Sequence, residues 1–219
     1  MKLKKIASLA LAGIMAVSML AGCKDAGNGN SGSSSTPTTP ASGYAATILA
    51  DTNDAQKYMT AGANTKIDQA VAAIATTGGA DNINGTTLTA WTLSAGKVST
   101  AKLIMTGANY WQSFDSGNTA EGNTSKNVNM LVNKKDGTFY SLYYVDKKVG
   151  DTMIDNLVAN ELDRIVKADI ADQNIGAGDS YSYTVDIATA DWADITEKDK
   201  AGAVVIGIAI TVDYTGTDY

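Results

Sequence analysis

The chain ends on a strongly apolar run, AVVIGIAITVDY, at residues 203–214. No polar side chain interrupts this run between Val204 and Ile210. A strand with one face in water alternates apolar and polar residues, whereas a strand that reads apolar at every position is covered on both faces. The run therefore predicts a strand in the interior of a β-sheet.

Strand patterns also precede this run, and most of them are arranged as hairpins. Residues 86–93 and 97–106 are rich in Thr, Leu, Val and Ile, and Ser94-Ala95-Gly96 suits the loop between them. Residues 128–132 and 139–145 alternate in the same way, and Lys135-Asp136-Gly137 supplies a turn with a residue able to adopt a left-handed conformation. A further alternating segment, 181–187, comes before the final run. Consecutive hairpins favour an antiparallel sheet.

Helical patterns occupy three segments. The strongest is 151–170, whose apolar residues form one continuous stripe and whose Thr152 and Asp155 resemble a capping box. Residues 64–77 repeat apolar residues at helical spacing, with a second candidate capping box at Thr65 and Asp68. A short helix is predicted over 51–60, with a cap at Asn53 or Asp54. Each helix has one stripe to bury, so we expect an α+β fold in which the three helices pack on one face of a mainly antiparallel sheet.

The amino-terminal segment has the layout of an export signal. Lys2, Lys4 and Lys5 are followed by an apolar run from Ile6 to Leu20, which is at the short end for spanning a bilayer. The run ends in Leu20-Ala21-Gly22-Cys23, which resembles the lipobox of bacterial lipoproteins. This resemblance covers residues 1–23 only.

The resemblance implies that residues 1–22 are removed and that Cys23 carries a diacylglycerol. Two or more acyl chains hold a protein firmly at a membrane, because each buried methylene contributes about 0.8 kcal/mol. Cys23 is the single cysteine of the chain, so it has no disulfide partner here. The alternative is a secreted protein cut near an unmodified Cys23. We expect a lipid anchor on the extracytoplasmic face of the cell membrane.

Residues 23–43 predict a flexible spacer between the anchor and a single globular domain at 44–219. The spacer is rich in Gly, Ser, Thr and Asn and contains both prolines of the chain, Pro37 and Pro40. Such a segment cannot bury enough apolar surface to offset the entropy lost on ordering.

The composition excludes several classes of chemistry. The chain has no histidine, which removes His-dependent triads and imidazole metal sites. Its net charge is −6 and Arg164 is its single arginine, which argues against nucleic acid as a partner. Neither a phosphate-binding loop nor a dinucleotide-binding pattern is found. We expect no cofactor and no metal centre.

Carboxylates are the remaining candidates for chemistry. An Asp pair brought together by the fold could serve a hydrolase such as a glycosidase. Acidic and amide side chains also gather at 51–54, 115–121 and 169–179, where they could bind calcium, although Asp and Asn form turns and caps unaided. None of these segments fits the twelve-residue calcium loop.

The segment 107–127 is the candidate ligand-binding region, because it predicts a long loop between two hairpins. Aromatic faces beside amides and carboxylates are typical of sugar or peptide recognition. The candidate patch consists of Tyr110, Trp111, Phe114, Asp115 and Asn118. The alternative is that its aromatic residues turn inward as a small core beneath the loop.

Three functions follow from these patterns. The first is a lipid-anchored binding or adhesion module of the cell envelope, with a carbohydrate or protein ligand. The second is a structural or assembly component that pairs through a sheet edge. The third is the carboxylate hydrolase. The missing catalytic side chains and the spacer favour the first.

Overall fold

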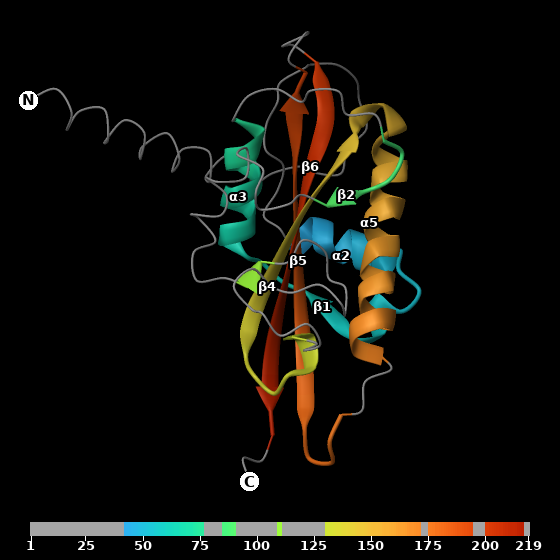
Figure 1. The fold of residues 1–219 in the computed structure, drawn as a ribbon. Coiled ribbons are helices and arrows are strands. Elements are labelled where there is room, and N and C mark those ends of the chain that lie inside the picture. The colour runs from blue at the N-terminus through green and yellow to red at the C-terminus, as the bar shows by residue number, and fades with distance from the viewer. Residues whose placement is uncertain are drawn as a thin grey trace, which may run out of the picture.

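A computed structural model of the chain describes residues 42–76, 85–90, 109–110, 130–171, 175–194 and 200–216. The structural statements below refer to these residues. They form one sheet with a long central hairpin, flanked by three α-helices (Figure 1).

The central hairpin joins strand β5, Ser180–Ala193, to strand β6, Ala201–Thr215. The two strands pair antiparallel along their whole length, with one irregularity between Trp192 and Ala193. Strand β6 lies between β5 and β4, and every residue from Ala203 to Ile210 is buried. The predicted interior strand is confirmed.

The other strands complete a mixed sheet in the order β1-β5-β6-β4-β2. Strand β4, Gly137–Asp146, pairs antiparallel with β6. Strand β1, Met59–Ala61, pairs parallel with β5. Two short strands pair with β4: β2, Thr89–Ala90, antiparallel, and β3, Asn109–Tyr110, parallel. The sheet is mainly antiparallel, as predicted.

The three α-helices are α2, Ser42–Ala50, α3, Thr65–Ala75, and α5, Asp151–Val166. One π-helical turn, η5, Lys167–Ala171, follows α5. Three short 3-10 helices lie between the larger elements: η1, Ala55–Lys57, η3, Met130–Val132, and η4, Lys147–Val149. The α+β class is confirmed with three α-helices, of which α2 takes the place of the helix predicted over 51–60.

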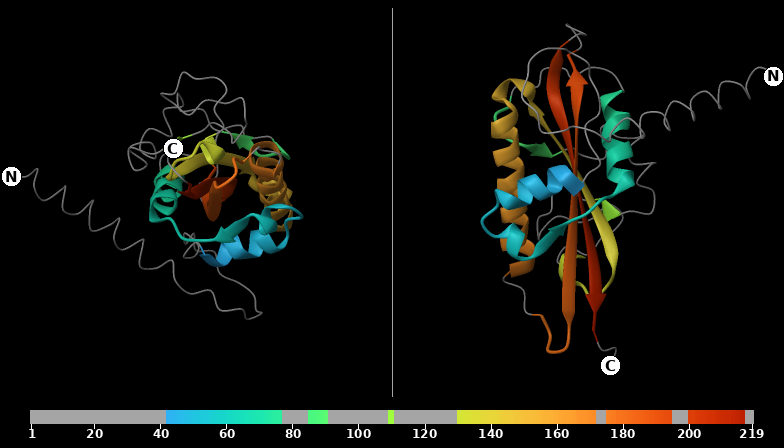
Figure 2. Two further views of the ribbon diagram at one scale, coloured as in Figure 1. Left: turned by 90° about the horizontal axis from the view of Figure 1, so that it is seen from below. Right: turned by 180° about the vertical axis from the view of Figure 1, so that it is seen from behind.

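The helices lie on both faces of the sheet, so the expectation that all three share one face is wrong. Helices α2 and α5 pack on one face and α3 packs on the other, as Figure 2 shows in the view from below. The reason is the composition of the central strands. In β6, Ile206 and Ile208 face α5, while Val205 and Ala209 face α3. Both sides of the sheet are apolar at this height, so both need a cover.

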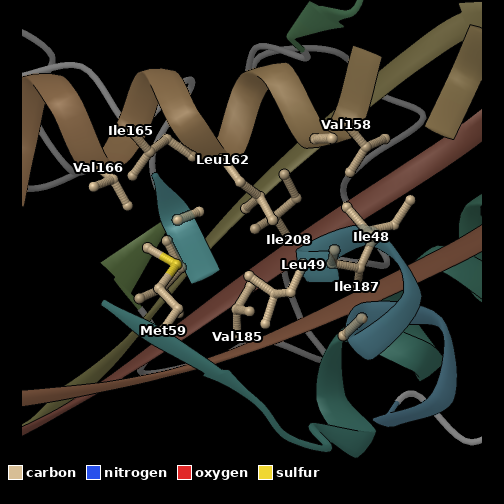
Figure 3. Close-up of a cluster of buried hydrophobic side chains, with 14 of the residues drawn as sticks. Ile48, Leu49, Met59, Val158, Leu162, Ile165, Val166, Val185, Ile187 and Ile208 are labelled. Atoms are coloured by element: carbon tan, nitrogen blue, oxygen red, sulfur yellow. The ribbon is translucent and has the colours of Figure 1, made fainter. Parts of the chain in front are cut away.

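The larger core lies between α5, α2 and the central strands. Val158, Leu162 and Ile165 of α5 point towards Ile187 and Ile208, with α2 closing the gap (Figure 3). The predicted apolar stripe of α5 therefore packs on the sheet. Met153, which the sequence pattern places in this stripe, lies outside it and is 49% exposed.

The smaller core lies between α3 and the opposite face. Ile67 and Val71 of α3 sit directly over Gly207 of β6, where a Cβ atom would come within 2.6 Å of each side chain. The absence of a side chain at Gly207 is what allows the helix to approach the strand this closely.

The predicted hairpin of 128–132 with 139–145 is not formed as a pair of strands. Residues 130–132 form the 3-10 helix η3 and β4 pairs with β6, β2 and β3. Tyrosine side chains take the hydrogen bonds that a ladder would have used: Tyr183 donates to the Leu131 carbonyl and Tyr181 to the Val132 carbonyl, both at 3.0 Å. Lys134, with φ of 62°, takes the left-handed conformation expected within 135–137.

The predicted helix caps are replaced by other groups. Asn64, rather than Thr65, caps α3 by accepting from the N–H groups of Lys66 and Ile67. Helix α5 follows Gly150 without a side-chain cap. In the predicted helix 51–60, only Ala55–Lys57 is helical. Helix α2 comes before it and begins at Ser42, within the last two residues of the predicted spacer. Of the first predicted hairpin, residues 91–106 lie outside the described part of the chain.

Candidate functional site

The predicted site residues fall mostly outside the described ranges. Cys23, Trp111, Phe114, Asp115 and Asn118 all lie there. Of the candidate patch, the backbone of Tyr110 is described: it belongs to β3 and is the register partner of Tyr140 in β4. The patch therefore begins on the edge of the sheet formed by β4, β2 and β3.

Two described acidic residues of the predicted calcium segments form ion pairs. Asp54 forms an ion pair with Lys57 at 2.7 Å, and Asp179 forms one with Lys134 at 2.8 Å. Asp179 also accepts from the Tyr214 hydroxyl at 2.6 Å. Within the described ranges, no group of three or more His, Cys, Asp or Glu side chains is placed to bind a metal ion.

The fold brings two other carboxyl groups together at the start of α3. Asp186 lies in the middle of β5 with only 2% of its surface exposed. Its Oδ2 accepts a hydrogen bond of 2.5 Å from the backbone N–H of Asn64, the residue that caps α3. Asp68 follows one helical turn after Asn64, and its own N–H donates to the Asn64 carbonyl at 3.3 Å.

The sheet register places Tyr140 beside this pair. Asp186 and Tyr140 are both opposite Ala209 of β6, so the three residues form one row across β5, β6 and β4. Ala209 is small, so it leaves the space above it to the larger side chains on either side. The Asn64 side-chain amide spans that space and donates to the Tyr140 hydroxyl at 3.3 Å.

The electrostatics of the pair favour protonated carboxyl groups. Burial raises the pKa of Asp68 to about 6. Burial is also the largest effect on Asp186 and raises its pKa, and the charge of the nearby Asp68 raises it further. The backbone N–H groups of Asn64 and Ile187 lower the pKa, and the net value is about 7. Between about pH 4 and pH 6 the two carboxyl groups therefore retain protons that ordinary aspartates would have lost, and Asp186 does so up to about pH 7.

This pair is not arranged for glycoside hydrolysis. Hydrolysis by two acids needs the sugar to lie between them, whereas Asp186 is covered by the start of α3. The glutamate Glu161 is engaged in other contacts: it accepts from the Tyr143 hydroxyl at 2.8 Å and pairs with Arg164 at 2.8 Å. Glu121 and Glu197 lie outside the described ranges.

A row of four threonines follows the Asp186 row on the same face of the sheet. Thr60 is opposite Thr184, Thr184 is opposite Thr211, and Thr211 is opposite Thr138. We call these four residues the threonine row. Thr60 is exposed and the other three are half-buried. The Thr138 and Thr211 hydroxyl oxygens are 3.0 Å apart. Neighbouring strands are about 4.8 Å apart, so the four residues form a continuous polar row. The Thr60 hydroxyl donates to the Tyr183 carbonyl at 3.3 Å.

Sequence reasoning missed both the carboxyl pair and the threonine row. Asp186 is a charged residue within an otherwise apolar stretch, Val185 to Ala188, and this could have marked it. The threonine row gives no signal in the linear sequence, because its members come from four strands whose register is set by the fold.

Comparison with known proteins adds no relative. No protein-family model matches the chain, no curated protein matches its sequence and no solved structure matches it. Among the described residues, no helix combines the length and apolar character needed to cross a membrane.

Proposed function

We propose that this chain is a lipid-anchored, extracytoplasmic module of the cell envelope that binds a carbohydrate or protein ligand. The lipobox-like sequence ending in Cys23, the single cysteine, supports the anchor. The threonine row supports binding and is the observation that carries this part of the proposal. A carbohydrate is the ligand that its chemistry favours.

The position of the tether supports this assignment. The spacer leads into α2, which packs beside β1 and β5. Strands β4 and β2 lie towards the opposite edge of the sheet (Figure 2). The Tyr44 hydroxyl donates to Asp155 at 2.6 Å and fixes α2 on α5. The edge where the Tyr110 patch begins is therefore remote from the point of attachment.

The side chains around the threonine row match a hydroxyl-rich polymer. A threonine hydroxyl both donates and accepts hydrogen bonds, as a sugar hydroxyl does. The next positions on this face, Ser182 and Asp213, are exposed and extend the polar surface. A row of groups that both donate and accept suits an extended glycan chain. The aromatic residues of the neighbouring patch would supply stacking faces for sugar rings.

A pull-down of the mature chain with insoluble polysaccharide from the cell envelope tests this proposal. The double variant Thr184→Val and Thr211→Val keeps the shape of the row and removes two hydroxyls. Each lost hydrogen bond is worth about 1 kcal/mol, so we expect affinity to fall about tenfold or more. Thr189→Val makes the same change on the opposite face of β5 and should leave binding unchanged. Equal binding by wild type and the double variant would contradict the proposed surface.

An assembly component of the envelope is the second candidate, favoured by the outer edge of β5. Of this 14-residue strand, only Tyr183–Val185 pairs with β1 on that side among the described residues. An unpaired edge can receive a strand from another chain. Sedimentation velocity over a hundredfold concentration range distinguishes the candidates, because an assembly component should associate as its concentration rises. A constant monomer mass would remove this candidate.

A further inference from the structure

Asp186 is a buried carboxyl group in which one oxygen has no hydrogen-bond partner. Its Oδ2 accepts from the Asn64 N–H at 2.5 Å, but its Oδ1 has no hydrogen-bond partner among the described residues. A buried carboxylate with an unsatisfied oxygen is costly, because it has lost its water and gained nothing in return. A proton on Oδ1 would remove the charge and turn this oxygen into a donor.

The described groups near Asp186 include one other side chain whose charge acts on it. Helix α3 contributes Asp68, and β4 contributes Tyr140, whose hydroxyl accepts from the Asn64 amide. Strand β6 contributes Ala209 at the register position opposite, which does not titrate. Neither Asp68 nor Asp186 forms an ion pair with a lysine or with the single arginine within the described ranges. The charge of Asp68, which raises the pKa of Asp186, is therefore not offset by a neighbouring cation.

We propose that a proton on Asp186 holds the first turn of α3 on β5, and that loss of this proton, which leaves Asp186 and Asp68 both charged, releases that turn. The pair then acts as a pH-sensitive latch on the helix. This inference is independent of the proposed ligand.

The latch acts on the start of α3 because Asn64 connects Asp186 of β5 to the first turn of this helix. The Asn64 N–H donates to Asp186, while its side chain caps α3 at Lys66 and Ile67. When both carboxyl groups are charged, they repel each other in a site that little water reaches. Strand β5 is held along its length by β6, so the short connection at Asn64 is the part able to move.

The direction of the pH effect follows from the raised pKa values of about 6 for Asp68 and about 7 for Asp186. Both lie above the ordinary aspartate pKa of about 3.9. Stabilisation by the pair is complete below that ordinary value. It declines as pH rises towards 7, because the unfolded chain releases these protons more readily than the folded chain does. The latch is closed in acid and opens in mild alkali.

Hydrogen exchange of the whole mature chain tests the latch. Exchange is measured by mass spectrometry at pH values from 5 to 8.5, and each rate is divided by the intrinsic rate at that pH. We expect protection of the first turn of α3, residues 64–69, to be highest at pH 5 and to fall as the pH rises towards 7. Little further change is expected above that pH, because the closed and the open turn have then both lost the proton. Protection of α5 should not change. Uniform protection of residues 64–69 across this range would overturn the proposal.

Two variants and a control complete the test. Asp186→Asn keeps the shape and removes the titrating charge, so protection of residues 64–69 should stay high at every pH. Asp68→Asn, a partly exposed position, serves if the first variant does not fold. It removes the repulsion between the two charges, so the fall in protection should be smaller than in wild type. Asp213→Asn, exposed on the neighbouring strand, should behave as wild type. A wild-type pH profile in either Asp186→Asn or Asp68→Asn would overturn the latch.

Discussion

Replacing Gly207 with alanine should loosen α3 from the sheet. The added Cβ would lie 2.6 Å from Ile67 Cγ1, 2.6 Å from Val71 Cγ2 and 2.7 Å from Ile67 Cδ1. Ordinary carbon–carbon contacts are about 3.5–4.0 Å, so the helix must retreat by roughly 1 Å. Both side chains are branched near the backbone and fully buried, which leaves them no alternative position.

The net cost combines two opposing effects. Overpacking of a close-packed core costs about 1–3 kcal/mol. Replacing glycine with alanine returns about 0.4–1 kcal/mol, because the unfolded chain has less freedom to lose. We therefore expect a net loss of about 1–2 kcal/mol, which for a domain of this size lowers the melting temperature by roughly 2–8 °C.

Urea unfolding followed by circular dichroism measures this loss. Gly85→Ala is the matched control, because the nearest atom to its added Cβ is 3.8 Å away. The control should be as stable as wild type or slightly more stable. The reasoning is refuted if Gly207→Ala unfolds at the same urea concentration as Gly85→Ala with an unchanged slope.

Three further changes have defined outcomes. Asp163→Ala removes a carboxylate that accepts from the N–H groups of Asn53, Asp54 and Ala55 at 2.9, 2.8 and 2.8 Å, and should cost about 1–2 kcal/mol. Burial raises the Asp163 pKa, but these N–H groups together lower it below its ordinary value. The stabilisation is therefore present at neutral pH and is lost as the pH falls below about 4. Urea unfolding at pH 7 and at pH 3 should show that the stability difference between the variant and wild type disappears in acid. Tyr44→Phe removes the 2.6 Å hydrogen bond to Asp155 and should cost about 1 kcal/mol in thermal unfolding, with a cost near zero counting against a fixed α2. Trp111→Ala distinguishes the two roles expected for this side chain. If Trp111 belongs to a ligand-binding patch, the variant should lose glycan binding and keep its stability. If Trp111 belongs to a small core beneath the loop, the variant should lose stability and keep its binding.

The parts of the fold that the sequence predicts are those with a strong local pattern. The run from Val204 to Ile210 is apolar at every position, and β6 is buried at each of them. The stripe of α5 repeats at helical spacing, and most of it packs on the sheet. In both cases hydrophobic burial alone fixes the element, so a linear pattern is sufficient.

The layer arrangement could not be predicted in the same way. The sequence shows that α3 has an apolar face but does not show which side of the sheet it meets. That choice depends on Gly207, a residue distant in sequence whose missing side chain makes room for Ile67 and Val71. The hairpin expected at 128–145 failed for a similar reason, because the hydroxyls of Tyr181 and Tyr183 compete for the backbone carbonyls of η3.

The carboxyl pair and the threonine row depend entirely on register. Asp68 and Asp186 are brought together by the contact between Asn64 and β5, which no local pattern indicates. A shift of β5 by one residue would turn Asp186 and Thr184 to the opposite face of the sheet. Sequence reasoning therefore reached the class of chemistry, carboxylates and hydroxyls, without reaching the residues.

Mass spectrometry of the protein extracted from membranes tests the proposed anchor most directly. The measurement isolates the amino-terminal peptide of the mature chain. The lipoprotein proposal predicts a peptide that begins at Cys23 and carries the mass of a diacylglycerol on the cysteine sulfur. An unmodified Cys23, or a mature chain that begins elsewhere, would contradict it.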